Sequence, residues 1–311
     1  MKTVKALIVP GTIFLSFWIF AVLFWQITGS LFFIFNFGYI GTAIGIGLSL
    51  YSLLPGKKKQ IGRRIAQLLV GLYLLGYLGL MMKENMQIEG FFLLLLSGYF
   101  AASVIHYIVA KILGPLIYGR GYCSWACWTS MFLDFLPFKE NRNGRTATGW
   151  GLFRYIHFAL SLLLVLSLWF LFDYRPEPRG DSALVWLIVG NTLYFSTSII
   201  LAFVLKDNRA FCKYICPVTV ILKLTTRFSL LKIEGDKEKC TGCGLCNKSC
   251  PMDIDIVKYV RRGERVLSTE CISCFTCTAA CPKGALKDTF GLDIGGKEYL
   301  QRKIENEGVV R

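Results

Sequence analysis

The chain has 311 residues, of which 54% are hydrophobic, 14% aromatic and 18% charged, and its formal net charge is +15. This composition is too apolar for an ordinary soluble globular protein and predicts a polytopic membrane protein. The basic residues fall between the apolar segments, where they set membrane orientation. We therefore expect lipid around the protein and no nucleic-acid partner.

Six segments are long and apolar enough to cross a bilayer, which takes about 20 mostly apolar residues per helix. In chain order the predicted transmembrane helices are 6–27, 31–54, 65–82, 90–110, 150–172 and 183–205. Lys2 and Lys5 precede the first helix, as in a signal peptide. Its apolar run is longer than the roughly 7–15 residues of a signal sequence, so we expect an uncleaved anchor.

Lysines and arginines are unevenly distributed between the predicted helices. One alternate set of connecting segments contains Lys57, Lys58, Lys59, Arg63, Arg64, Lys111, Arg120, Lys139, Arg142 and Arg145. The other set contains only Lys83, Arg175 and Arg179. Because basic loops stay in the cytoplasm, this asymmetry predicts a multi-pass protein of the cytoplasmic membrane with both termini on the cytoplasmic side.

All twelve cysteines lie on the predicted cytoplasmic side or at its membrane boundary. Thiols stay reduced in the cytosol, so structural disulfides are not expected there. Dense cysteine spacing in this compartment instead indicates metal binding or redox chemistry.

The chain divides into a transmembrane domain at 1–231, a ferredoxin-type domain at 232–290 and a charged tail at 291–311. The second domain contains two runs with the spacing C-x2-C-x2-C-x3-C-P. Each such run supplies three cysteines to one 4Fe-4S cluster and sends its fourth to the other cluster. The predicted ligands of cluster 1 are Cys240, Cys243, Cys246 and Cys281, and those of cluster 2 are Cys250, Cys271, Cys274 and Cys277.

Segments 227–235, 256–268 and 284–292 have the composition of short strands and complete the prediction of a small α+β bacterial-type ferredoxin domain. Zinc is the alternative occupant of C-x2-C motifs. Zinc ribbons usually separate their two cysteine pairs widely, whereas each run here has four cysteines close together, so the spacing favours iron–sulfur clusters.

Two further cysteine pairs lie at the edge of the predicted membrane domain. Arg120, Tyr122, Cys123, Cys127 and Thr129 match a second copy of the same pattern, formed by Arg209, Phe211, Cys212, Cys216 and Thr219 with a one-residue slip at the threonine. If each C-x3-C segment is helical, both thiols of a pair share one face. The four thiols are candidates for a metal or additional cluster, for a dithiol redox relay, or for small buried core residues.

The two histidines both lie in predicted membrane helices, His106 in the fourth and His157 in the fifth. Intramembrane ionisable groups are costly and often functional. Arg154 and His157 share a helical face, so these two residues and His106 are candidate quinone contacts. Interfacial packing and a bis-histidine haem are the alternatives.

Transmembrane helices, two C-x3-C segments and the double cluster motif together resemble the NapH/NosR/CcoG group of membrane polyferredoxins. The resemblance covers nearly all of the chain. One departure is Trp128, which follows Cys127 where the group's motif has proline, whereas Cys216 keeps Pro217. Six helices are also more than a NapH-like build leads us to expect.

The resemblance implies two 4Fe-4S clusters and electron transfer between a cytoplasmic donor or the quinol pool and a membrane or periplasmic redox system. The protein would then be a component of an oxidoreductase system, with redox partner proteins in one of those compartments. Two other classes stay open: a copper-type metal reductase or maturation factor that uses the membrane-edge thiols, and a structural anchor for a soluble partner.

Overall fold

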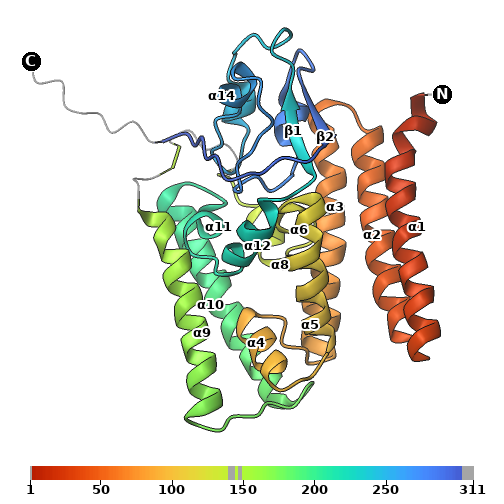
Figure 1. The fold of residues 1–311 in the computed structure, drawn as a ribbon, viewed down its shortest axis with the longest axis vertical. Coiled ribbons are helices and arrows are strands. Elements are labelled where there is room, and N and C mark those ends of the chain that lie inside the picture. The colour runs from red at the N-terminus through yellow and green to blue at the C-terminus, as the bar shows by residue number, and fades with distance from the viewer. Residues whose placement is uncertain (1, 139–143, 146–148, 303–311) are drawn as a thin grey trace, which may run out of the picture.

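The computed structural model describes residues 2–138, 144–145 and 149–302. Within these residues, five helical segments are long and apolar enough to cross a membrane. They are α1 (Lys2–Thr28), α2 (Phe32–Leu53), α3 (Lys59–Leu72) with its π-helical continuation η2 (Tyr73–Met81), α9 (Phe153–Phe170) and α10 (Asp181–Leu205). Figure 1 shows α1, α2 and α3 on one side of the molecule and α9 and α10 on the other, with shorter helices between the two groups. Lys139, Arg142 and the tail beyond Arg302 lie outside the described residues.

The predicted fourth membrane helix, 90–110, is wrong as a continuous element. The segment is divided into α4 (Ile88–Leu96), a non-helical stretch at 97–101, and a second helical run made of α5 (Ala102–His106), η3 (Tyr107–Leu113) and α6 (Gly114–Tyr118). Gly98 ends α4 with a φ of +71°. The amides of Gly98 and Tyr99 bond to Leu95 and Leu94 at 3.2 and 3.0 Å, the pattern of a Schellman cap. In place of the six predicted transmembrane helices, the described residues thus form five long helices and one apolar segment that is divided in two.

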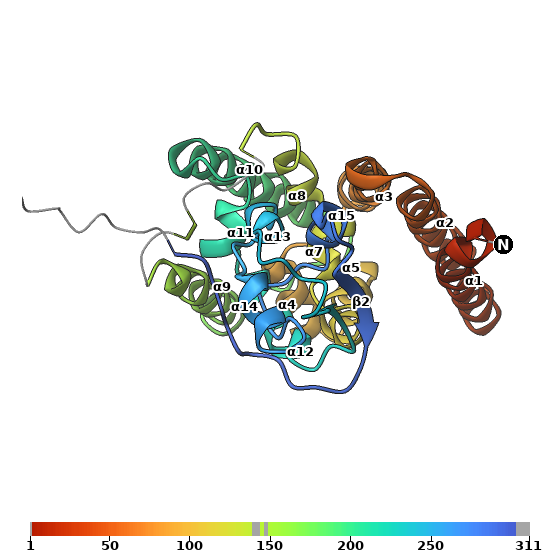
Figure 2. The same cartoon turned by 90° about the horizontal axis from the view of Figure 1, so that it is seen from above.

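Glycines allow α2 to pack closely against both of its neighbours. A Cβ atom at Gly41 would lie 2.3 Å from Cβ of Phe17 in α1, and one at Gly47 would lie 2.4 Å from Cβ of Ala66 in α3. Figure 2 shows α1 and α2 extending away from the other helices. This arm leaves the central space to α3, α9, α10 and the shorter helices between them.

Four short helices lie between the long helices and the C-terminal portion (Figure 1). They are α7 (Gly121–Trp125), α8 (Trp128–Leu133), α11 (Ala210–Tyr214) and α12 (Val218–Thr226). The start of α1 lies at this same end of the molecule. The two C-x3-C segments and the C-terminal portion are thereby brought to one side of the helices.

The C-terminal portion contains a two-stranded antiparallel sheet and three short helices. Strand β1 (Leu231–Gly235) pairs with β2 (Leu286–Phe290), with Leu231 opposite Phe290. The helices are α13 (Leu245–Lys248), α14 (Ile256–Arg261) and α15 (Thr276–Ala280). The strand expected within 256–268 is wrong at its start, because Asp255 caps a helix there by accepting a bond from the Lys258 amide at 3.2 Å.

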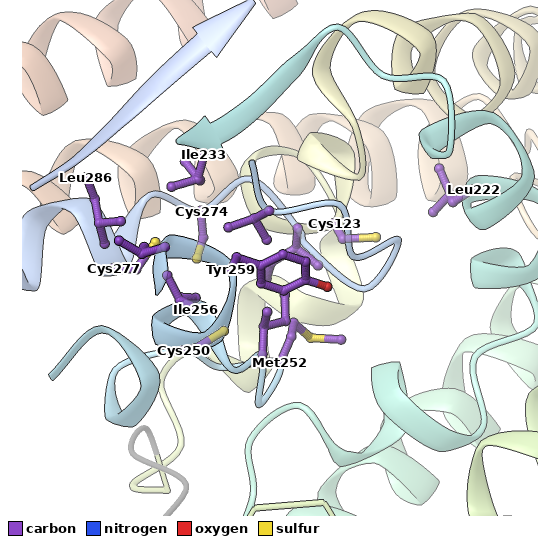
Figure 3. Close-up of a cluster of buried hydrophobic side chains, with 14 residues drawn as sticks. Cys123, Leu222, Ile233, Cys250, Met252, Ile256, Tyr259, Cys274, Cys277 and Leu286 are labelled. Atoms are coloured by element: carbon purple, nitrogen blue, oxygen red, sulfur yellow. The ribbon is translucent and has the colours of Figure 1, made fainter. Parts of the chain in front are cut away.

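The C-terminal portion shares a hydrophobic core with the short helices α7 and α12. Cys123 of α7 and Leu222 of α12 belong to the same buried cluster as Ile233, Cys250, Met252, Tyr259 and Cys274 (Figure 3). Burial of this apolar surface holds the two portions together. Cysteines of both runs therefore share one buried cluster with Cys123 of the first C-x3-C pair.

Candidate iron–sulfur sites

The structure brings four cysteines together around one open pocket. Cys240, Cys243 and Cys246 from the first run and Cys281 from the second line it, and its volume is about 380 Å³ including the open space at its mouth. Cys243 is exposed and the other three are half-buried. A bacterial-type 4Fe-4S cluster takes three cysteines from one run and the last cysteine of the other run. These four residues therefore fit such a cluster.

The remaining four cysteines line a second pocket. Cys250, Cys271, Cys274 and Cys277 surround it together with apolar side chains that include Ile233, Met252 and Ile272. Three of these cysteines are buried, and Figure 3 shows Cys250, Cys274 and Cys277 within one group of apolar side chains. This pocket also fits a 4Fe-4S cluster, in a drier environment than the first.

The two cysteine loops adopt the same left-handed backbone at matching positions. In the first loop the residues are Gly242 and Gly244, with φ of +70° and +72°; in the second they are Ser273 and Phe275, with φ of +49° and +54°. A left-handed conformation costs roughly 1–2 kcal/mol per residue for side chains other than glycine. The second loop therefore needs outside support that the first does not.

Helices α2, α3 and α7 provide that support by hydrogen bonds to the carbonyl groups of the second loop. Donors from α2, α3 and α7 satisfy four carbonyls in a row. The bonds are Ser124 Oγ to Ile272 at 2.6 Å, Trp125 Nε1 to Ser273 at 3.0 Å, Gln60 Nε2 to Cys274 at 3.2 Å and Tyr51 Oη to Phe275 at 3.2 Å. The hydroxyl of Ser273 in turn donates to the carbonyl of Tyr118. Five hydrogen bonds from four consecutive residues, 272–275, thus fix the second loop to α2, α3, α6 and α7.

The two C-x3-C segments share one local structure, but it is not a continuous helix. Cys123 and Cys212 lie within α7 and α11, and each helix ends before the second cysteine of its pair. The amide of Cys127 bonds to the Tyr122 carbonyl at 3.0 Å, and that of Cys216 bonds to the Phe211 carbonyl at 2.9 Å. The expectation of an unbroken helical turn through both thiols is wrong, while the internal repeat is reproduced in three dimensions.

The thiols of the two pairs lie close to one another. Burial raises the pKa of Cys212 to about 11; Arg209 opposes this rise, whereas Cys123 and Cys127 of the other pair add to it. Arg120 has the same relation to Cys123, whose pKa is raised by burial and lowered by that guanidinium. A metal or cluster bound here would deprotonate these thiols and stand between two arginines.

Glu270 accepts ion pairs from four cationic side chains and directly precedes Cys271. Its partners are Arg120, Arg145 and Arg154, each at 3.0 Å, and Lys223 at 2.6 Å. Burial raises the pKa of the Glu270 carboxyl, but the three arginines and Lys223 more than offset this and hold it well below its usual value. Glu270 therefore joins the second cysteine loop to three separate parts of the membrane domain.

A second buried network joins the two repeats to each other. Asp134 accepts from Arg209 at 2.6 Å and from Arg63 at 2.8 Å. Asp134 follows Cys127 by seven residues, and Lys223 follows Cys216 by the same interval. The carboxylate that pairs with Arg209 thus comes from the first repeat, while the carboxylate that pairs with Arg120 is Glu270 of the C-terminal portion.

Positive charge exceeds negative charge in these buried networks. Six cationic side chains pair with only two carboxylates, Glu270 and Asp134. In a third network Lys213 pairs with both Asp207 and Asp253, so that network has a net charge of one negative unit. Arg120 Nε and Nη2, Arg154 Nε and Arg209 Nε are buried without a nitrogen or oxygen acceptor among the described residues, while the Cys123 and Cys212 thiols lie beside Arg120 and Arg209 as hydrogen-bond partners. Buried charge of this kind requires compensation.

Two family models match the chain. A 4Fe-4S dicluster domain matches residues 232–282, and a 4Fe-4S binding domain matches residues 101–138 and 189–234. The two pieces of the second match each contain one C-x3-C pair. They therefore follow the internal repeat.

Several curated proteins are similar to the chain. An uncharacterized protein of Methanocaldococcus jannaschii is 30% identical over 199 residues, which cover 60% of this chain and 70% of that protein. The ferredoxin-type protein NapH of Haemophilus influenzae is 23% identical over 208 residues, covering 63% and 71%. The chain belongs to the NapH-like polyferredoxin family.

The putative electron transport protein YccM of Escherichia coli is 24% identical over 196 residues, covering 58% of this chain and 54% of YccM. No solved structure matches. Ferredoxin-type relatives and two 4Fe-4S family models give this NapH-like chain an iron–sulfur electron-transfer role. Among the described residues, no three His, Cys, Asp or Glu side chains are arranged to hold a single metal ion.

The three candidate quinone contacts of this NapH-like protein all have protein partners. Arg154 pairs with Glu270, His157 Nδ1 lies 2.9 Å from the Ile215 carbonyl oxygen, and His106 Nε2 lies 3.4 Å from Tyr122 Oη. A joint contact of Arg154 and His157 with a quinone stays a prediction. Each histidine contacts a residue that adjoins one of the C-x3-C cysteines.

Sequence reasoning missed Glu270, Asp134 and the support of the second loop. No spacing rule connects Glu270 to Arg120 or Arg154, since more than 100 residues separate them. One signal was available: a glutamate immediately before Cys271 has no role in the cysteine motif itself. Identifying its four partners required the folded chain.

Proposed function

We propose that this NapH-like protein carries single electrons between a soluble carrier in the cytoplasm and a redox system in or across the membrane. Its first set of cysteines would hold cluster 1, its second set cluster 2, and the two C-x3-C pairs a third centre. When bound, such clusters supply one-electron redox chemistry. The chain's own residues hold these centres in place, shield them from water and balance their charge.

One observation carries the proposal: the three cysteine sets follow one another from the exposed surface to the membrane edge. The first set lines an open pocket, with Cys243 exposed. The second set is mostly buried and its loop is bonded to α7 through Ser124 and Trp125. The same helix carries Cys123, which shares a buried cluster with Cys250 and Cys274. A relay of electrons needs this kind of succession, whereas an anchor protein does not.

Charge supports an anionic centre at the C-x3-C pairs. Four thiolates around a 4Fe-4S cluster carry net negative charge, which would compensate Arg120 and Arg209 and accept from their buried N–H groups. A relay of neutral dithiols and disulfides would leave the same groups uncompensated. The 4Fe-4S binding domain that matches both pairs supports the same assignment.

The side of the membrane is also part of the proposal. The C-terminal portion and the start of α1 lie at one end of the molecule (Figure 1). Lys58 and Arg63 connect the second and third predicted helices, and Arg120 follows the fourth, so the alternation of helices assigns all three to this end. The positive-inside rule assigns this end to the cytoplasm of a cell with a cytoplasmic membrane.

Iron and sulfide counting on anaerobically purified protein tests the proposal. We expect about twelve irons per wild-type chain, and about eight in Cys216→Ser with the two ferredoxin signals retained in low-temperature EPR spectra. Cys274→Ser should instead lose cluster 2. Zinc in place of iron would contradict electron transfer, and copper bound at the four membrane-edge thiols would favour the metal-handling alternative.

A further inference from the structure

The exposed surface around the first cysteine pocket has a small apolar centre and a basic rim. Cys243 is exposed and Leu245 is 45% exposed at the centre. Lys239 and Lys283 line the mouth of the pocket, and both are exposed. A guanidinium nitrogen of Arg261 lies 2.8 Å from where a Cβ at Gly242 would be. Three cationic side chains thus surround the loop that contains Cys243.

Most of this positive charge is available to a partner. Lys239 pairs with Asp236 at 2.7 Å, on a surface that water screens. Lys283 and Arg261 have no carboxylate partner in the part of the chain that the structure describes. Surface charges of one sign steer an oppositely charged protein and raise its association rate by roughly 10 to 1,000-fold at low salt.

The second pocket offers no comparable surface. Its loop is covered by Tyr51, Gln60 and Trp125, which bond to the carbonyls of residues 273–275. Three of its four cysteines are buried. A soluble protein therefore reaches the cysteine sites of this chain most closely at the first pocket.

From this geometry we propose that the surface formed by Lys239, Cys243, Leu245, Arg261 and Lys283 is the docking site for an acidic, soluble one-electron carrier of ferredoxin or flavodoxin type. The inference rests on the proposed electron-transfer function and names its partner class. With the cluster bound, one electron would leave the reduced carrier, which would be oxidised, and would reduce the iron–sulfur centre held by Cys240, Cys243, Cys246 and Cys281. No bond forms or breaks, and the transfer can run in either direction.

Stopped-flow reduction of the full-length holoprotein in detergent tests the docking site. The probe is a chemically reduced acidic bacterial ferredoxin, mixed at low ionic strength under anaerobic conditions. We expect a second-order rate that falls steeply as salt is added, and a decrease of about tenfold in Lys283→Glu. Lys283→Arg should keep the wild-type rate, because it retains the charge.

Lys206→Glu is the matched control, since Lys206 is exposed at the end of α10 and the charge change is the same. It should alter the rate by less than about twofold. Equal losses in Lys206→Glu and Lys283→Glu, or a wild-type rate that does not change with salt, would overturn the docking site. A neutral small reductant distinguishes failure of the docking site from failure of the electron-transfer function. If it reduces an iron–sulfur signal at equal rates in all variants, the electron-transfer function is supported, whatever the result of the docking test. If it reduces none in the wild type, that function fails.

Discussion

The two cysteine loops have the same spacing and the same backbone conformation but opposite surroundings. The first reaches its left-handed positions with Gly242 and Gly244 and lines an open pocket. The second has Ser273 and Phe275 at these positions and depends on bonds from Tyr51 and Trp125. The same motif therefore occurs in two settings: a loop with glycine at its left-handed positions that lines an open pocket, and a loop whose carbonyl groups are bonded to α2, α3 and α7.

Among substitutions that affect the two loops unequally, Glu270→Gln should have the largest effect. The substitution removes the charge that balances three arginines and Lys223, and breaking a buried ion pair costs about 3–5 kcal/mol. We expect loss of cluster 2 on purification, with cluster 1 retained, measured by iron content and EPR. Glu264→Gln, which removes an exposed ion pair with Lys297, is the control and should leave both signals unchanged. Equal retention of cluster 2 in both variants would contradict the role given to Glu270.

A moderate effect is expected for Trp125→Phe. This change keeps most of the ring but removes the Nε1 donor, and leaving the buried Ser273 carbonyl unsatisfied costs about 1–3 kcal/mol. Iron should leave the second site faster in the presence of a chelator, while the first site releases iron at the wild-type rate. Faster loss from both sites would show that the two loops are not supported separately.

The smallest effect should come from Gly244→Ala, which weakens the first loop and leaves the second unchanged. A Cβ at Gly244 meets no atom within 4 Å, so the cost is purely the left-handed backbone, roughly 1–2 kcal/mol. Chelator extraction should now be faster from the first site alone. Thr241→Ala, at an exposed neighbouring position, serves as the control. An unchanged first site would mean that this loop does not need glycine.

The sequence predicted the elements that depend on short-range patterns. Apolar length located five of the long helices, and cysteine spacing grouped the residues that now surround each of the two pockets. It failed where local signals competed. Gly98 ends α4 inside an apolar run that hydropathy treats as one helix, and Asp255 caps a helix in a segment rich in residues that favour strands.

Contacts between distant segments could not be predicted from a single sequence. The bond from Tyr51 to Phe275 spans 224 residues, and the pair of Arg154 and Glu270 spans 116. Local patterns carry no information on such pairs, because their formation depends on how whole helices pack. The positions of Arg63, Arg120 and Arg154 in the sequence therefore gave no sign that all three are buried ion-pair partners.

The proposed succession of centres from the exposed pocket to the membrane edge is tested most directly by low-temperature EPR of the fully reduced holoprotein. Reduced clusters that lie close together broaden and split each other's signals. We predict that the wild-type spectrum contains such interactions, and that Cys212→Ser removes those that involve the membrane-edge centre while leaving a pattern of two coupled clusters. A Cys212→Ser spectrum identical to that of the wild type would contradict the account, because the membrane-edge thiols would then hold no centre beside cluster 2.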